Sequence, residues 1–124
     1  MIHLDTHVVA WLYAGRTDLL SDVARAKIEG EPLAVSPMVL LELEYLHEIG
    51  RVTQPSVDVI THLAAQIGLS VSQAPFDAVI ASARPLSWTR DPFDRIIVGQ
   101  SIAEGSPLVT RDETIRANHG GAVW

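Results

Sequence analysis

Five carboxylates stand at positions where they could hold a cation together: Asp5, Glu42, Asp91, Asp94 and Asp112. Two of the aspartates come at the end of short β-like runs, and two others open a strongly apolar helical segment. If the fold brings such groups together, their mutual repulsion raises their pKa values and destabilises the protein unless a cation lies among them. Oxygen ligands favour hard ions, so the expected cofactor is Mg²⁺ or Mn²⁺.

Glu42 is the most informative of these acids. On a helix that begins at Pro37, the residues within about 60° of Glu42 are all apolar or aromatic. They are Met38, Val39, Tyr45, Leu46 and Ile49. This pattern predicts a carboxylate in the middle of a buried stripe, which is costly unless the group is paired or binds a metal. An ion pair with an arginine, or a place at the margin of the stripe, explains Glu42 equally well.

Taken singly, the aspartates also have structural explanations. Asp5 and Asp112 could each be a helix N-cap, and Asp91 fits an N-cap that is followed by proline at the first helical position. Asp94 would then be the third helical residue, where the longer Glu or Gln is preferred, so capping explains it less well. Taken together, the acids favour a cation site.

The composition restricts the other kinds of chemistry. The chain has 124 residues with 48% hydrophobic content, enough for one domain over residues 1–124. The absence of cysteine excludes disulfides and thiolate sites. A net charge of −6 argues against a general nucleic-acid-binding surface but leaves a local site open. No apolar run is long enough for a membrane span and no signal peptide is recognised, so we expect a cytoplasmic protein.

Short β-like runs alternate with longer helical patterns along the chain. The predicted strands are residues 2–5, 33–35, 69–72, 107–110 and 122–124. The predicted helices are residues 6–13, 18 or 21 to 29, 37–49, 55–67, 76–83, 92–104 and 112–117. This order predicts an α/β fold, a three-layer α/β/α sandwich with a central, mainly parallel sheet. Sites in such folds form beyond the carboxyl ends of the strands.

The order of the acids resembles the PIN-domain family over nearly the whole chain. The resemblance extends from Leu4-Asp5-Thr6-His7 to Leu108-Val109-Thr110-Arg111-Asp112 and includes the small-residue-then-Glu segment from Ser36 to Glu42. The run from Arg90 to Gln100 is similar to the form common among VapC-type toxins. His7 stands where many members carry Asn, a departure that affects a substrate or water contact rather than the acids.

The resemblance assigns roles to individual residues. It implies that the metal-binding and catalytic acids are Asp5, Glu42, Asp94 and Asp112. Asp91 would be an accessory metal ligand. Three residues are candidates for substrate binding: Thr110, Arg95 and Arg111. Each also has a structural alternative, and for Arg95 we favour pairing with the nearby carboxylates. Trp88 could stack an unpaired base or simply pack.

By resemblance, the protein is a metal-dependent endoribonuclease that uses one or two divalent ions and leaves 5′-phosphate and 3′-hydroxyl ends. It would be the toxin of a toxin–antitoxin pair, a homodimer inhibited by an antitoxin whose tail enters the acidic cleft. The chain has no DNA-reading motif of its own. One alternative is a PIN-like domain that binds RNA or a partner without cutting. The other is a phosphoacceptor receiver module, which needs a late lysine, whereas the only lysine is Lys27.

Overall fold

A five-stranded parallel sheet forms the centre of the computed structural model, which describes all 124 residues. The strands are β1 (Ile2–Leu4), β2 (Leu33–Val35), β3 (Ser70–Val71), β4 (Leu108–Val109) and β5 (Ala122–Val123). They pair in the order β3-β2-β1-β4-β5, and every pair is parallel. Parallel neighbours need long crossover connections, which the helices supply.

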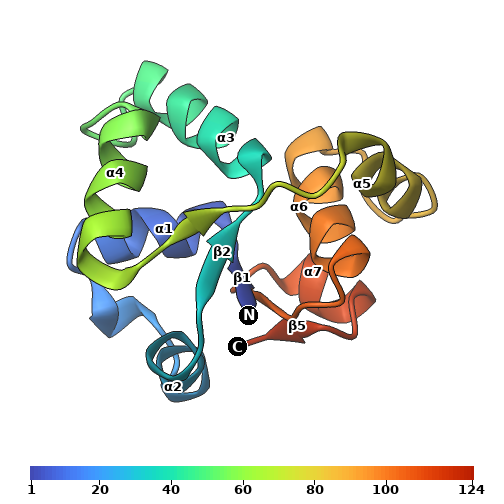
Figure 1. The fold of residues 1–124 in the computed structure, drawn as a ribbon, viewed down its shortest axis with the longest axis horizontal. Coiled ribbons are helices and arrows are strands. Elements are labelled where there is room, and N and C mark those ends of the chain that lie inside the picture. Colours follow the sequence, from blue (N-terminus) through green and yellow to red (C-terminus); the bar gives the residue numbers. More distant parts are fainter.

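Seven helices and one 3₁₀ turn connect the strands. The helices are α1 (Thr6–Tyr13), α2 (Asp22–Gly30), α3 (Pro37–Glu48), α4 (Ser56–Ile67), α5 (Phe76–Ala83), α6 (Pro92–Ala103) and α7 (Glu113–Asn118), and the 3₁₀ turn is η1 (Thr17–Leu19). Figure 1 shows α1 and α4 on one side of the sheet and α6 and α7 on the other. The predicted three-layer α/β/α sandwich is therefore confirmed, and its sheet is parallel throughout.

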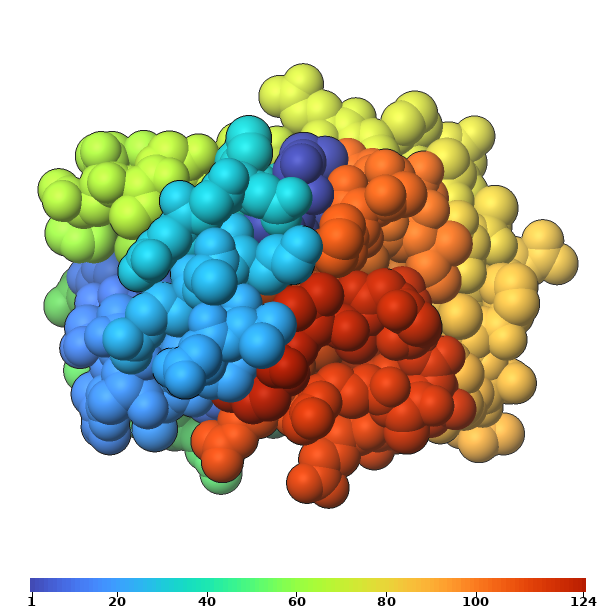
Figure 2. All heavy atoms as spheres, turned by 90° about the horizontal axis from the view of Figure 1, so that it is seen from below, coloured from blue at the N-terminus to red at the C-terminus, as the bar shows by residue number.

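The central strand β1 places the first acid. It pairs with β2 on one side and with β4 on the other. The backbone N–H of Ile2 donates to the carbonyl of Pro32, and that of His3 donates to the carbonyl of Pro107. Figure 2 accordingly shows the N-terminal residues (dark blue) between segments near residue 32 (cyan) and residue 107 (orange). Asp5, directly after β1, thus lies at the middle of the carboxyl edge.

Local sequence signals account for most element boundaries. Ser36 caps α3 through its Oγ, which accepts a hydrogen bond from the Met38 N–H, and a proline follows at the first helical position. Ser21 caps α2 in the same way, so the helix predicted to start at Asp18 or Ser21 begins at Asp22. Four of the five strands are shorter than predicted, because pairing ends where the neighbouring strand ends. No helix has the length and apolar character needed to cross a bilayer.

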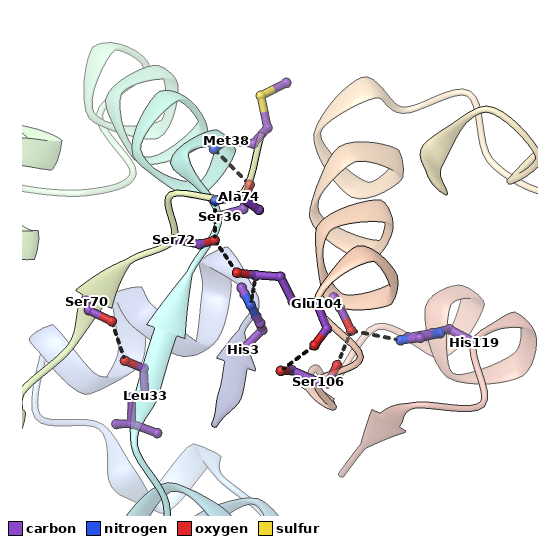
Figure 3. A network of polar contacts seen from close by, with 11 residues as sticks. His3, Leu33, Ser36, Met38, Ser70, Ser72, Ala74, Glu104, Ser106 and His119 are labelled. Carbon is purple, nitrogen blue, oxygen red and sulfur yellow. Dashed lines mark hydrogen bonds and ion pairs between the residues drawn. The ribbon is translucent and has the colours of Figure 1, made fainter. Parts of the chain in front are cut away.

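A buried polar network attaches the end of α6 to the sheet. The His3 side chain, only 1% exposed, contacts the Glu104 carboxylate through Nε2. Ser72 Oγ donates to Glu104 Oε1 at 2.5 Å, and Figure 3 shows both side chains reaching the same carboxylate. Burial lowers the pKa of His3, and the Glu104 charge opposes that shift. The network anchors the C-terminal end of α6, the helix whose first turn carries Asp94.

The contact between α5 and α6 depends on a glycine. A Cβ atom on Gly99 would lie 2.7 Å from the Ala83 Cβ and 3.0 Å from its backbone. We expect Gly99→Ala to lower the free energy of unfolding by about 1–3 kcal/mol, because the two helices must separate. Urea denaturation measures the change, with Gly30→Ala as the control, since a Cβ there meets nothing within 4 Å. Equal stability of the two variants would contradict this account of the packing.

Candidate functional site

Asp5 is buried at the carboxyl edge of the sheet and holds two hydrogen bonds. Its Oδ1 accepts from the Thr6 N–H at 2.8 Å, which caps α1, and its Oδ2 accepts from the Thr110 hydroxyl at 2.6 Å. The residue is 5% exposed. Burial raises the pKa of the Asp5 carboxyl, while the two hydrogen bonds oppose the shift. A carboxylate oriented in this way keeps lone pairs for a cation.

Thr110 joins the ends of β1 and β4. Its hydroxyl donates to Asp5 and also accepts the backbone N–H of Asp112 at 3.1 Å. Asp112 Oδ1 in turn accepts from the Ile115 N–H at 2.9 Å, so Asp112 is the N-cap of α7. Thr110 is completely buried, and its one donor is already used. These bonds favour a role in positioning Asp5 and Asp112 over a direct contact with RNA.

Asp94 lies at the electrostatic centre of the acids. It is half-buried in the first turn of α6. Burial, followed by the negative charges of its acidic neighbours, raises the pKa of Asp94 to about 7. In order of decreasing effect, these neighbours are Asp91, Asp5, Asp112 and Glu42. The structure therefore brings the other four sequence-predicted acids within electrostatic range of Asp94, and we call the five together the acidic cluster.

Glu42 reaches the acidic cluster from α3. Burial raises its pKa, and the charges of Asp5 and Asp91 raise it further. The buried hydroxyl of Thr6 lowers the Glu42 pKa, although Thr6 Oγ1 has no partner within hydrogen-bond geometry. The sequence had not indicated Thr6 as part of the site. A buried hydroxyl beside a carboxylate, with no other partner, is a polar group that a bound ligand can satisfy.

The helix around Glu42 differs from the predicted buried stripe. Tyr45 and Ile49 are 50% and 49% exposed, so the expectation that they flank Glu42 in the interior was wrong. The buried face of α3 is formed by Val39, Leu43 and Leu46. Glu42 is thus half-buried at the margin of this face, the alternative that the helical pattern had left open. No arginine forms an ion pair with it.

Asp91 is an exposed N-cap of α6. Its Oδ1 accepts hydrogen bonds from the N–H groups of Phe93 at 2.9 Å and Asp94 at 3.4 Å. We expect Asp91→Ser to retain most activity and stability, because serine caps helices as well as aspartate does. Asp91→Ala should lose about 1 kcal/mol of stability while remaining active. Assays of RNA cleavage and urea unfolding check both variants, and near-complete inactivation of Asp91→Ser would identify Asp91 as a required ligand.

Arg95 points its guanidinium to backbone rather than to the acids. Its nitrogens donate to the carbonyl oxygens of Ala83, Arg84 and Thr89. The expected ion pairs between Arg95 and nearby carboxylates were therefore wrong, because its partners are backbone carbonyls. These hydrogen bonds still favour a structural role for Arg95 over substrate binding. Arg111, by contrast, is exposed, and its guanidinium carbon lies 5.9 Å from the ring centroid of Trp11. Arg111 remains available to a substrate.

The donor set fits a hard divalent cation. Every acid of the cluster offers carboxylate oxygen, no cysteine is present, and His7 is the histidine that lies beside the acids. In the present side-chain arrangement no three acidic or histidine groups are close enough to enclose a metal ion. Burial is the largest cause of the raised pKa values of Asp5, Glu42 and Asp94, and the negative charges of neighbouring acids raise each of them further, so the ionised carboxylates carry an electrostatic cost. A cation would remove that cost, so the residues fit the metal that the sequence predicted.

This fold and this cluster define a known class of protein. Residues 2–119 match the family model of the PIN domain, and the chain belongs to the PIN-domain family. It is 33% identical over 117 residues to Ribonuclease VapC22 of Mycobacterium tuberculosis (strain ATCC 25618 / H37Rv), an alignment that covers 93% of this chain and 89% of that protein. Family membership decides against the receiver module.

Two solved structures share the fold. A chain of the toxin-antitoxin complex from Klebsiella pneumoniae gives a TM-score of 0.69 at 18% identity, covering 100% of this chain and 97% of that one. A chain of VapBC2 from Rickettsia felis, bound to a DNA fragment from their promoter, gives a TM-score of 0.66 at 18% identity, covering 94% and 92%. At this identity the likeness concerns the fold.

Proposed function

We propose that this chain is a metal-dependent endoribonuclease of the VapC type and the toxin of a toxin–antitoxin pair. Membership of the PIN-domain family and similarity to a protein named as a ribonuclease support the proposal. The observation that carries it is the place of Asp94 among four other carboxylates, where burial and then their negative charges raise the pKa of Asp94 to about 7. Such strongly perturbed carboxyls in one place are typical of functional sites.

We assign metal binding and catalysis to Asp5, Glu42, Asp94 and Asp112, with Asp91 as an accessory acid. The ion would be Mg²⁺ or Mn²⁺, one or two per site. When bound, a divalent cation serves as a Lewis acid for water and for the phosphate oxygens in phosphodiester hydrolysis. Substitution of Glu42 by Gln keeps its shape and removes its charge, so this variant should lose cleavage if Glu42 takes part.

The residues of the chain itself prepare the site. Thr110 fixes the Asp5 carboxylate and the backbone of Asp112, so the two strand-end acids keep one relative position. Asp94 holds a proton up to a pH of about 7 in the absence of a cation and releases it when the surrounding negative charge is neutralised. His7, beside the acids, is exposed and is not required as a base.

Hydrolysis by this route gives 5′-phosphate and 3′-hydroxyl ends. The test is incubation of the purified protein with a mixture of total tRNA and rRNA in Mg²⁺ or Mn²⁺, with a chelator control, followed by mapping of the product ends. Metal-dependent cutting with these ends supports the proposal. Cyclic 2′,3′-phosphate ends, or cutting that persists in chelator, would instead assign the strand cleavage to the RNA 2′-hydroxyl.

We also propose a cognate antitoxin as partner and a homodimer as the assembled toxin. The two solved structures described above are toxin–antitoxin complexes, which supports the first. Exposed apolar side chains on α3 and on α5, Leu41 and Phe76 among them, support a self-association surface. Sedimentation equilibrium of the chain alone and with the product of an adjacent short reading frame tests both. A monomer at all concentrations would contradict the dimer.

A further inference from the structure

Aromatic and basic side chains border the acidic cluster on one side. His7 and Trp11 are four residues apart on α1 and therefore share one face of the helix. They line a hollow of about 310 Å³ together with Asp5, Arg111, Asp112 and Glu113. The same two side chains also line a second hollow of about 380 Å³. The His7–Trp11 pair is thus common to the acidic hollow and to its neighbour.

The indole of Trp11 contacts neighbouring side chains, but no aromatic ring is stacked parallel to it. The His7 ring lies 6.3 Å away at an interplanar angle of 49°, and the Trp124 ring lies 6.1 Å away at 56°. The Arg111 guanidinium stands 5.9 Å from the ring centroid. Trp11 is half-buried and packs against the core, whereas His7 is exposed. The ring is therefore positioned in advance, with no aromatic side chain stacked face to face on it.

The second hollow is lined by aromatic, apolar and basic side chains, whereas acids line much of the first. Besides His7 and Trp11 it is lined by Tyr13, Arg16, Arg51 and apolar side chains, and no carboxylate lines it. Arg16 is paired with Asp18, but the Arg51 guanidinium makes no ion pair. In a chain with a net charge of −6, a hollow with aromatic walls and arginines at its border is distinctive. Aromatic faces with nearby cations are the general means of binding an unpaired base and its phosphate.

We infer that His7 and Trp11 form a stacking site for one unpaired nucleobase of the RNA, next to the phosphate that a cation at the acidic cluster would bind. The inference rests on the proposed function. A base in a duplex is already stacked and paired, and cannot occupy such a hollow. Trp88, the residue that the sequence offered for stacking, is also half-buried against the core, but it lines neither hollow. The site would bind the base through stacking and shape complementarity, and Arg51 or Arg111 would lie near the phosphates of the adjoining RNA backbone.

The test measures binding separately from cleavage. A fluorescein-labelled, random-sequence RNA of about 12 nucleotides, a length that covers one stacking site and its flanks, is titrated with protein in Mg²⁺. The same RNA annealed to its complement is the duplex probe. All proteins carry Asp94→Asn, which prevents cutting and removes the metal's contribution to affinity equally from each, so that the differences between them report the stacking site. We expect His7→Ala and Trp11→Leu to weaken single-strand binding about tenfold, since stacking on one aromatic ring has an effect of this order. Trp11→Phe should rescue most of the affinity, and Trp88→Leu should leave it unchanged.

Several outcomes would overturn the inference. These are equal affinity for the duplex, unchanged affinity in both His7→Ala and Trp11→Leu, and an effect in Trp88→Leu as large as in Trp11→Leu. Thermal melting of each variant verifies folding. If Trp11→Leu is destabilised, His7→Ala still tests the site, because His7 is exposed and its replacement should not affect folding. Variants that retain RNA affinity but lose antitoxin binding would assign the surface to the protein partner. Cleavage by the wild type is scored separately, so failure of the ribonuclease proposal is recognised on its own.

Discussion

Replacement of Asp94 by asparagine should reduce RNA cleavage on the order of a thousandfold, equivalent to about 4 kcal/mol of transition-state stabilisation. The charges of all four other acids raise the pKa of Asp94, so Asp94 lies where a shared cation would be bound. Asparagine keeps the size of the side chain and the first turn of α6 but cannot supply a charged oxygen. The measurement is the initial rate of RNA cleavage at saturating Mg²⁺.

The same variant should be more stable than the wild type without metal. A buried carboxyl among like charges costs free energy, and removal of its charge relieves that cost. Asp77→Asn is a matched control, because Asp77 is exposed on α5 and is not among the acids that shift Asp94. A stable variant that retains cleavage would refute the assignment of Asp94. A large loss of metal-free stability would instead show that the carboxylate is structural.

Divalent metal should change how the stability of the wild type depends on pH. The pKa of Asp94 is raised in the folded chain from 3.8 to about 7, so between these values the folded state holds a proton that the unfolded state has released. The unfolding free energy without metal therefore falls as pH rises from about 4 to about 7. The raised pKa values of Asp5 and Glu42 act in the same direction.

Other groups titrate in the same range, so the comparison is made against Asp94→Asn. The lowered pKa values of His3 and His119 give a slope of opposite sign, but they are present in both proteins. We expect the wild type to lose more stability with rising pH than the variant. At about 100 times its Kd, Mg²⁺ should add roughly 3 kcal/mol to the wild type, a rise in Tm on the order of 10 °C, and much less to the variant. Identical pH slopes without metal would contradict the electrostatic account.

The sequence predicted the fold well because the signals are local. Proline at the first helical position marks the starts of α3 and α6, and the N-cap expected at Asp91 forms. Alternating strands and helices then leave few arrangements other than a parallel sheet. The strand lengths were less predictable, since the end of β4 depends on how far β1 and β5 extend beside it.

The candidate site was predictable in its acids and not in its surroundings. The acids follow strands or open helices, positions that can be read locally, whereas their partners come from distant parts of the chain. Thr110 bonds to Asp5 across 105 positions, and the His3–Glu104 pair joins equally remote segments. Helical periodicity placed Tyr45 in the interior, but only the Phe93 ring of α6 stacks against it, and the side chain stays 50% exposed. The sequence spacing of His7 and Trp11 alone could have indicated their shared face. The roles of the individual acids, the single domain and the cytoplasmic location stay predictions.

The most direct test of the central claim follows metal binding and RNA cleavage in one titration. Mn²⁺ is added to metal-free protein, bound ion is counted by electron paramagnetic resonance, and cleavage of one RNA is measured at each point. The account predicts that the two curves coincide for the wild type and that Asp94→Asn shows neither tight binding nor cleavage. Full cleavage before any Mn²⁺ is bound, or unchanged binding and cleavage in the variant, would contradict a metal-dependent ribonuclease centred on this acidic cluster.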